Sequence, residues 1–224
     1  MNGLKLSKRL SAAASFVRDG AVCADIGTDH AYLPIYLVGS GIASFAVASD
    51  INEGPIASAN DNIKKYGLEN KISTQIADGL DGISQYKPDH ILICGMGGEL
   101  IARIIEDSSY VKKNGIKLIL QPMTSIKELR EYLAHGFSVY DEAIVWDSGK
   151  YYQIICAEYD GNDHIYTDLE LEVGKINIRD KKPLFTEYIN HLLKKKRRVY
   201  DGLKAGGRDL SYAEKEIKEL EALL

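Results

Sequence analysis

The sequence predicts an α/β fold in which a doubly wound, mostly parallel sheet ends in an antiparallel edge and is followed by an antiparallel helical hairpin. Short apolar runs alternate with segments of helical periodicity through residues 21–136, the pattern of a sheet with helices on both faces. Two β-rich runs, FSVYDEAIVW and YYQIICAEY, then flank a hairpin-like turn at residues 147–150. We therefore expect a sheet domain over residues 1–160 and a C-terminal helical appendage over residues 161–224.

Composition places the chain among ordinary globular proteins, with 45% hydrophobic and 27% charged residues. Its apolar runs are shorter than the roughly 20 residues that span a bilayer, and the start MNGLKLSKRL leads into an amphipathic segment instead of a signal sequence. A cytoplasmic protein is expected. The three cysteines, Cys23, Cys94 and Cys156, are far apart and form no CxxC pair, so we expect neither a disulfide framework nor a zinc site.

The first expected element is a helix over residues 4–17, which would cover one side of the sheet. Lys5, Lys8 and Arg9 lie on its polar side. A solvated face is the simpler interpretation of these cations, and a basic surface that receives phosphates is the alternative. Helical spacing puts five apolar side chains on the other face, namely Leu6, Leu10, Ala13, Ala14 and Val17.

The stretch VCADIGTDHAYLP at residues 22–34 is the centre of the predicted site. A strand over residues 21–26 precedes a helix that begins near Ala31, and ligands bind at such strand ends in open α/β sheets. Gly27 lets the backbone approach a ligand closely. A dinucleotide fingerprint would need glycines at Thr28 and Ala31, and the two carboxylates of the turn would repel a pyrophosphate. The turn therefore suits a ligand that carries positive charge and hydroxyl groups.

Acidic residues end each of the first three predicted strands. Asp25 closes the first strand, Asp50 follows a strand over residues 43–49, and Asp78 follows a strand over residues 72–77. Asp50 lies about 20 residues after the glycine of the first turn, the offset at which an acidic residue binds ribose hydroxyls in nucleotide-binding βαβ units. A single strand-end aspartate is more often a helix cap or a turn former. Three in succession at one sheet edge favour a binding site.

A glycine-rich segment, GMGG at residues 95–98, follows a fourth strand over residues 90–94. Such glycines indicate backbone that is closely approached by a substrate or a neighbouring strand, or else a flexible loop. Gly136 is expected to stop the last helix of the sheet domain. The other elements expected there are helices over residues 52–66, 99–106 and 124–135 and a strand over residues 115–120.

Beyond residue 160 the pattern changes to two helices, over residues 183–200 and 210–224, joined across the glycines of residues 202–207. The net charge of the chain is −4, yet Lys194, Lys195, Lys196, Arg197 and Arg198 are consecutive on the first of these helices. Positive charge is therefore local. The hairpin is either a packing or dimerisation element or a contact for a polyanion.

The residues together predict a nucleotide-like cofactor that is held by acids instead of a phosphate loop. Asp50 would bind a ribose and Asp78 an adenine amino group. S-adenosyl-L-methionine meets these demands, because it has an adenosine end without phosphate and its sulfonium and ammonium groups are cationic.

Four blocks of sequence carry a family resemblance: DIGTDHAYLP at residues 25–34, SDIN at 49–52, ADGL at 77–80 and GMGG at 95–98. With the helical hairpin behind them, they resemble the TrmK family of bacterial tRNA methyltransferases, which act on N1 of adenosine 22. The resemblance implies a Rossmann-like class I methyltransferase domain and a coiled-coil-like tail that together hold tRNA. GMGG replaces the (D/N)PP(Y/F) motif of many amino-methylating enzymes, which makes an exocyclic amine a less favoured target.

The site residues are predicted from the chemistry of methylation at a ring nitrogen. Such a nitrogen already has an in-plane lone pair, so the enzyme has to align it with the methyl group and to place a carboxylate near the cation that forms. Asp29 is the candidate carboxylate, with His30 to orient it and Tyr32 to stack on the base; a structural role at the helix start is the alternative for His30. Cys94 is expected to line the site without acting as a nucleophile. The residues expected at the cofactor are Asp25, Gly27, Asp50, Ile51, Asp78, Gly79, Cys94 and Gly95, and those expected at tRNA are Gly97, Gly98, Lys195, Arg197, Arg198, Lys5, Lys8 and Arg9. No metal is expected.

Three other interpretations are open. A class I methyltransferase that acts on another RNA base, a protein or a small molecule would explain the acids but not the basic hairpin. A noncatalytic RNA-binding module would explain the hairpin but not the acids. A nicotinamide dehydrogenase is disfavoured by the missing phosphate-binding glycines. The sequence leaves open whether the protein is a monomer.

Overall fold

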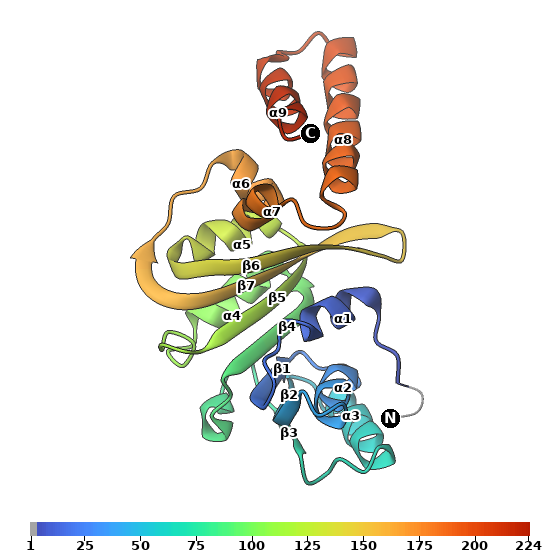
Figure 1. Ribbon diagram of the computed structural model, residues 1–224, viewed down its shortest axis with the longest axis vertical. Coiled ribbons are helices and arrows are strands. Elements are labelled where there is room, and N and C mark those ends of the chain that lie inside the picture. The colour runs from blue at the N-terminus through green and yellow to red at the C-terminus, as the bar shows by residue number, and fades with distance from the viewer. Residues whose placement is uncertain (1–3) are drawn as a thin grey trace.

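The computed structural model describes residues 4–224 and contains a seven-stranded sheet in the order β3-β2-β1-β4-β5-β7-β6 (Figure 1). Strands β1 to β5 are parallel, β7 is antiparallel to β5, and β6 is antiparallel to β7. This arrangement confirms the predicted fold class. The strands are β1 (Ala21–Ile26), β2 (Ala43–Asp50), β3 (Ile72–Ile76), β4 (His90–Gly97), β5 (Lys117–Thr124), β6 (His135–Asp147) and β7 (Lys150–Asp163).

Helices cover both faces of the sheet, and each face has its own hydrophobic core. One core joins α1, α2 and α3 to the sheet, with Ile35 at its centre, and the other joins α4 and α5 through Ile101 and Leu129. Parallel strands between two helical layers bury both of their faces. The helices are α1 (Lys8–Ala14), α2 (Tyr32–Gly39), α3 (Glu53–Lys65), the short 3-10 helix η1 (Ile83–Tyr86), α4 (Gly98–Glu106), α5 (Ile126–Leu133), α6 (Asp168–Val173), α7 (Lys175–Asp180), α8 (Phe185–Ala205) and α9 (Ser211–Glu221).

Hydrogen bonds tie together the carboxyl ends of the first three strands. Gly27 N donates to the carbonyl of Ser49 at 2.8 Å, and Ala77 N donates to the carbonyl of Asp50 at 3.0 Å. The β1–α2 turn is thereby fixed against the end of β2, and the end of β2 against the end of β3. The strand-end acids predicted from the sequence therefore share one edge of the sheet.

Strands β4 and β5 are longer than expected, because their ends pair with each other instead of turning away. The expected ends at residues 94 and 120 were wrong: β4 runs to Gly97 and β5 to Thr124. Most of the GMGG segment therefore belongs to a strand and is not a flexible loop. The register in this part pairs Cys94 with Gln121, Met96 with Pro122 and Gly97 with Thr124, with irregularities on both sides of Met96.

Gly136 does not stop a helix, which corrects the sequence prediction. Helix α5 already ends at Leu133, and Gly136 is the second residue of β6. Its φ of +99° accompanies a shift of register between His135 and Phe137. A Cβ at this position would lie 3.1 Å from the ring of Tyr159, so glycine is needed here for a strand irregularity that an aromatic ring covers.

Helix α1 is shorter than the expected span of residues 4–17. It begins after Ser7, whose hydroxyl accepts a hydrogen bond from Leu10 N at 3.4 Å, and it ends at Ala14. A serine in this position caps the helix because it satisfies a free N–H group of the first turn. Residues 4–6 have no regular secondary structure and are not part of the helix.

The C-terminal part contains more helix than expected. Helix α8 continues through Gly202 to Ala205, so only part of the expected glycine linker connects it to α9. The short helices α6 and α7 were not predicted. The sequence does hold a signal for α6, because Thr167 and Glu170 form a capping box, with each side chain bonded to the other's backbone N–H.

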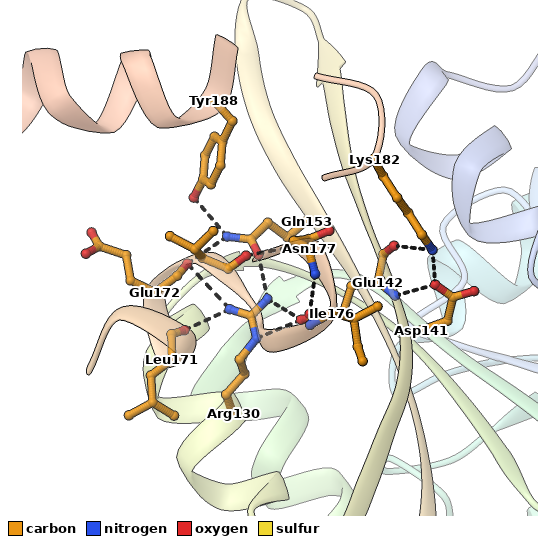
Figure 2. A network of polar contacts seen from close by, with 11 residues as sticks. Arg130, Asp141, Glu142, Gln153, Leu171, Glu172, Ile176, Asn177, Lys182 and Tyr188 are labelled. Atoms are coloured by element: carbon orange, nitrogen blue, oxygen red, sulfur yellow. Dashed lines mark hydrogen bonds and ion pairs between the residues drawn. The ribbon is translucent and has the colours of Figure 1, made fainter. Parts of the chain in front are cut away.

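A buried polar network joins the sheet to the C-terminal helices (Figure 2). Arg130 of α5 and Glu142 of β6 are fully buried and form an ion pair at 2.6 Å. Arg130 also donates to the carbonyl of Leu171 at 2.8 Å and to Gln153 Oε1 at 2.5 Å. Gln153 in turn donates to the hydroxyl of Tyr188 on α8 at 2.8 Å. The network therefore spans α5, β6, β7, α6 and α8.

The second oxygen of Glu142 lies at the start of α7. It accepts hydrogen bonds from the backbone N–H groups of Ile176 at 2.9 Å and Asn177 at 3.3 Å. Gly174 makes this possible: its φ is +98°, and a Cβ there would lie 2.4 Å from that carboxylate oxygen. Around the network, a third hydrophobic core packs α8 and α9 against the hairpin formed by β6 and β7. It includes Ile144, Val173, Phe185, Leu192 and Leu220.

Candidate active site

A cavity of about 340 Å³ opens at the carboxyl end of β1, where the sequence predicts the site. One wall is the turn between β1 and α2, and the other is the segment that leads into α1. Cys94 of β4 also borders the cavity. The charged and polar side chains that line it include Lys5, Arg9, Asp25, Thr28, Asp29 and His30.

Asp25 is buried in this cavity, with 7% of its surface exposed. Burial is the main reason that its pKa is raised to about 6; the nearby Thr28 hydroxyl lowers the pKa, and the charge of Asp50 raises it. Thr28 Oγ1 is itself buried; it lies close enough to Asp25 to lower the pKa of that carboxyl, yet within residues 4–224 it makes no hydrogen bond of good geometry. Buried polar atoms are normally paired, so an acid beside a spare hydroxyl fits a ligand that brings donors of its own.

Asp29, His30 and Tyr32 form a cluster at the cavity, so the structure brings together the three residues predicted to be catalytic. The Asp29 carboxylate is 79% exposed and lies 3.2 Å from His30 Nε2. The rings of His30 and Tyr32 are 5.3 Å apart at their centres. Ala31 adopts a left-handed φ of +55° before α2, and Asn62 of α3 donates to the His30 carbonyl at 3.1 Å. These contacts fix the turn and leave its side chains accessible.

The residues predicted to hold adenosine lie at the ends of β2 and β3. Asp50 Oδ1 accepts hydrogen bonds from the backbone and the side-chain nitrogen of Asn52, at 2.8 and 3.2 Å. Asp50 is thus a turn former, the role expected of a single strand-end aspartate. Only one of its two carboxylate oxygens takes part in the turn. Ile51 is 58% exposed. Asp78 and Gly79 line a second cavity, of about 280 Å³, on the side of α4.

Gly27 and Gly95 are each closely approached by a side chain of the site. A Cβ on Gly27, which has a φ of +76°, would lie 2.0 Å from Met96 Cε. A Cβ on Gly95 would lie 3.4 Å from the guanidinium of Arg9. Both contacts are with the ends of flexible side chains, so it is the left-handed φ of +76° at Gly27 and +84° at Gly95 that favours glycine at these positions.

Gly97 and Gly98 are explained by packing against the end of β5. A Cβ on Gly97 would lie 3.2 Å from Thr124 Oγ1, and one on Gly98 would lie 2.0 Å from the carbonyl oxygen of Ser125. Of the two explanations open from the sequence, a neighbouring strand accounts for these glycines without a substrate contact.

Arg9 points into the site, although its sequence position suggested the polar side of a surface helix. Its Nη1 donates to the buried Gln121 Oε1 at 2.6 Å, and its backbone N donates to Asp147 Oδ2 at 3.2 Å. Burial raises the pKa of the Cys94 thiol, Asp25 raises it further, and Arg9 lowers it. Cys94 thus lies between a negative and a positive wall. Arg9 and Gln121 are 112 residues apart in the sequence, so no local pattern could have predicted this hydrogen bond.

Comparison with known proteins identifies the family to which this chain belongs. A family model described as a methyltransferase domain matches residues 6–155. The tRNA (adenine(22)-N(1))-methyltransferase of Bacillus subtilis (strain 168) is 37% identical over 98% of this chain and 94% of its own length. The chain belongs to this methyltransferase family. The resemblance drawn from the four sequence blocks is thereby confirmed.

Two solved structures show the same fold with cofactor or product bound. The Streptococcus pneumoniae protein Sp1610, in complex with S-adenosyl-L-methionine, is 33% identical with a TM-score of 0.85, over 98% of this chain and all 100% of its own. M. capricolum TrmK, in complex with S-adenosyl-homocysteine, is 28% identical with a TM-score of 0.80, over 97% of this chain and 96% of its own. The similarity to these two structures therefore extends over the C-terminal helices as well as the sheet.

The cations predicted to contact tRNA are divided by the structure. Lys5 and Arg9 line the cavity, whereas Lys8 is exposed. On α8, Lys195 and Arg198 are exposed, and Arg197 forms an ion pair with Glu221 of α9 at 2.7 Å.

The structure of this methyltransferase also bears on metals and membranes. Within residues 4–224, no group of three or more histidine, cysteine, aspartate or glutamate side chains is placed to hold a metal ion. None of the helices in this described part of the chain combines the length and apolar character needed to cross a membrane.

Proposed function

We propose that this protein transfers the methyl group of S-adenosyl-L-methionine to N1 of adenosine 22 in tRNA. The observation that carries the proposal is the charge distribution of the cavity at β1, with the buried Asp25 on one wall and Arg9 on the other. The amino acid end of the cofactor is a zwitterion and needs both charges. The position that is methylated follows the activity for which the B. subtilis relative is named.

The amino acid end of the cofactor fits the cavity in one orientation. Its ammonium group would donate to the carboxylate of Asp25 and to the unpartnered hydroxyl of Thr28. Its carboxylate would pair with Arg9, whose guanidinium Gln121 already holds near Gly95 and Cys94. Arginine suits this role because its planar fork binds carboxylates through two parallel hydrogen bonds. Arg9 is therefore assigned to the cofactor and not to a tRNA phosphate.

The adenosine end would extend along the ends of β2 and β3. Asp50 has one carboxylate oxygen outside its turn, which would accept from the ribose hydroxyls. Asp78 would accept from the adenine amino group, with the backbone of Gly79 beside it. Ile51, an exposed apolar side chain, would pack against the adenine ring. The bound cofactor supplies a methyl group made electrophilic by a sulfonium.

The target adenine would enter at the Asp29 cluster. As N1 attacks, the N1–carbon bond forms while the carbon–sulfur bond breaks, so the bonding electron pair stays on sulfur and positive charge moves to the adenine. The Asp29 carboxylate would stabilise this charge and accept from the amino group of the base, and His30, 3.2 Å away, would orient it. Tyr32, which is 42% exposed, offers a ring for stacking. No proton has to leave N1 before the attack.

We also propose the division into a methyltransferase domain, residues 1–160, and a tRNA-binding appendage, residues 161–224. It is supported by the third hydrophobic core, which is separate from the two cores of the sheet. Strand β7 crosses the boundary and ends at Asp163. Since tRNA is the proposed substrate, the cytoplasm is the proposed place of action.

Arg9→Met tests the assignment of the cofactor. S-adenosyl-homocysteine carries the amino acid carboxylate, whereas 5′-methylthioadenosine lacks the amino acid part. Calorimetry should show that the affinity for S-adenosyl-homocysteine falls roughly tenfold or more, since a charge-assisted hydrogen bond contributes about 1.5–3 kcal/mol. The affinity for 5′-methylthioadenosine should stay near that of the wild type. Equal losses for both ligands, or no loss for either, would contradict the assignment.

Primer extension on tRNA tests the proposed function as a whole. Methylation at N1 blocks Watson–Crick pairing, so reverse transcription should stop at adenosine 22 after incubation with protein and S-adenosyl-L-methionine. A transcript with guanosine at position 22 is the control and should be read through. A stop at another adenosine would favour another RNA base as the target, and no stop on any tRNA would favour a protein or small-molecule substrate.

A further inference from the structure

The tip of the β6–β7 hairpin carries aromatic side chains that reach α8. Trp146 and Tyr151 are cross-strand partners next to the turn, and their ring centres are 4.6 Å apart. The ring of Tyr151 also lies 5.0 Å from the ring of His191 on α8. The hairpin extends beyond the sheet between α1 and the start of α8 (Figure 1). The three rings, one each from β6, β7 and α8, thus lie in a row with Tyr151 in the middle.

Cations continue this row of rings along α8. Lys194, Lys195 and Arg198 follow His191 at helical spacings that place all four on one face. Their charges lower the pKa of His191, after burial, which is the larger cause. All three cations are exposed, and within residues 4–224 none of them forms an ion pair. The other face of the basic run is neutralised, because Lys196 pairs with Glu172 and Glu216.

Trp146 is the single tryptophan of the chain and remains 39% exposed. Cross-strand aromatic pairs stabilise hairpins, which accounts for its contact with Tyr151. It does not account for the unpaired cations that adjoin the same rings. Proteins that bind single-stranded RNA combine these two features, because bases stack on aromatic rings while cations follow the phosphates.

The hairpin tip is connected to the cavity at β1. Asp147, the residue after Trp146, accepts a hydrogen bond from the backbone N–H of Arg9 at 3.2 Å. Arg9 lines the cavity. Trp146 and Asp147 are successive residues of β6 and point to opposite faces of the hairpin. The hairpin tip therefore contacts the cavity segment on one face and α8 with its free cations on the other.

We propose that Trp146, Tyr151, His191, Lys194, Lys195 and Arg198, the hairpin–α8 patch, bind an unpaired nucleotide of the substrate tRNA other than the target adenosine. The base of this nucleotide stacks on Trp146, and Lys195 and Arg198 contact the phosphates beside it. The nucleotide is unpaired because a base within a duplex has no free ring face to offer. This inference rests on the proposed function and adds a second contact by which the enzyme positions its substrate.

The emission of Trp146 reports on this contact directly, since no other tryptophan contributes. Titration of the wild-type protein with unmodified tRNA, in the presence of S-adenosyl-homocysteine to prevent turnover, should quench the emission as the base stacks. S-adenosyl-homocysteine alone should leave it unchanged. Quenching by tRNA that saturates with the filter-binding curve supports the patch.

Variants separate stacking from charge. Trp146→Ala should weaken tRNA binding by roughly 5-fold or more, because stacking of a base on an aromatic ring contributes about 1–3 kcal/mol. Trp146→Phe keeps a ring and should lose less affinity. Lys195→Ala and Arg198→Ala should each reduce the slope of log affinity against log salt by about 1. Lys215→Ala removes the same charge from α9, where Lys215 pairs with Glu219 at 3.7 Å, and should leave the slope unchanged. Thermal unfolding of each variant monitors the fold.

The failure of this inference differs from the failure of the proposed function. If the wild-type protein methylates adenosine 22 but its emission does not respond to tRNA and Trp146→Ala binds normally, the patch is only a hairpin contact. Equal salt slopes for Lys195→Ala and Lys215→Ala would likewise overturn the role of the cations. If the wild-type protein neither binds nor methylates tRNA, the proposed function fails and the patch with it.

Discussion

Two groups of buried charged residues in this protein differ in how completely their polar atoms are paired. In the junction network, the buried polar network of Arg130 and Glu142 that joins the sheet to the C-terminal helices, both oxygens of Glu142 accept hydrogen bonds. Arg130 donates to a carboxylate, a side-chain amide and a carbonyl. In the cavity at β1, Asp25 is also buried but its pKa is raised to about 6, and the hydroxyl of Thr28 has no partner within the described residues. The two groups are similarly buried, but the charged groups of the junction network are hydrogen-bonded, whereas the cavity keeps a buried hydroxyl without a partner.

The difference distinguishes a structural site from a binding site. The charged groups of Arg130 and Glu142 are fully paired and need no further component, although Asn177 Oδ1 beside them is buried without a partner within residues 4–224. The pair therefore fixes the position of α6, α7 and α8 on the sheet. An unpaired buried group lowers the stability of the free protein and is retained where a ligand completes it. Substitutions in the network should consequently affect folding, whereas substitutions in the cavity should affect ligand binding or turnover and leave folding almost unchanged.

The largest effect is expected from Glu142→Ala, which leaves the guanidinium of Arg130 buried without its counterion. Removal of one partner of a buried ion pair destabilises a protein by about 3–5 kcal/mol. Urea denaturation should show this loss in the free energy of unfolding. The double variant Arg130→Met/Glu142→Leu removes both charges and should recover part of this loss, because the Leu171 carbonyl and the Ile176 N–H then lack their partners; a single variant as stable as the wild type would contradict the comparison.

Asp29→Ala should act on turnover alone. The carboxylate is 79% exposed, so the free energy of unfolding should change by less than about 0.5 kcal/mol. Single-turnover methylation of tRNA should fall by roughly 10²-fold or more, as expected when a positioned catalytic group is lost. Calorimetry with S-adenosyl-homocysteine should show nearly unchanged affinity, and a variant that methylates at the wild-type rate would reduce Asp29 to a turn residue.

The raised pKa of Asp25 predicts pH-dependent cofactor binding. An ammonium ligand binds the carboxylate form, so below the free-protein pKa of about 6 a proton must leave before the ligand binds. Affinity for S-adenosyl-homocysteine should therefore be constant above this pH and fall about tenfold per pH unit below it. Asp25→Asn should bind more weakly at neutral pH and show a flat profile; a sloping profile in this variant would assign the proton to another group.

The smallest effect is expected from Thr28→Val, which replaces an unpartnered hydroxyl by a methyl group of similar size. The free energy of unfolding should stay the same or rise by about 1 kcal/mol, because no hydrogen bond is lost and a buried polar group is removed. Cofactor affinity should fall by roughly 2- to 10-fold. A clear loss of stability would show that the hydroxyl is paired in solution and would remove the contrast with Glu142.

The sheet could be predicted from the sequence because each of its signals is local. Asp25, Asp50 and Asp78 each end an apolar run, and parallel strands bring such ends to one edge whatever the rest of the chain does. The turn that holds Asp29, His30 and Tyr32 was likewise contained in one short stretch. The capping box of Thr167 and Glu170 is also a local signal and would have been sufficient to predict the start of α6.

The features that the sequence did not show depend on contacts between distant segments. Gly98 reads like a substrate-binding glycine until the carbonyl of Ser125 is seen against it. Arg9 reads like a surface cation until Gln121 is placed beside it. The ion pair of Arg130 and Glu142 has no local signal either, because its remaining partners come from β7 and from the short helices α6 and α7, which were not predicted.

The junction network also sets an order of events during synthesis of the chain. Arg130 and Glu142 leave the ribosome before Leu171, Ile176 and Tyr188, with which the network is completed. Until those later residues emerge, the charged pair at the sheet edge has to remain hydrated, so β6 and β7 cannot settle fully onto the domain. A nascent chain arrested near residue 160 should therefore expose this edge to proteases and chaperones, and release of the last helices should close it.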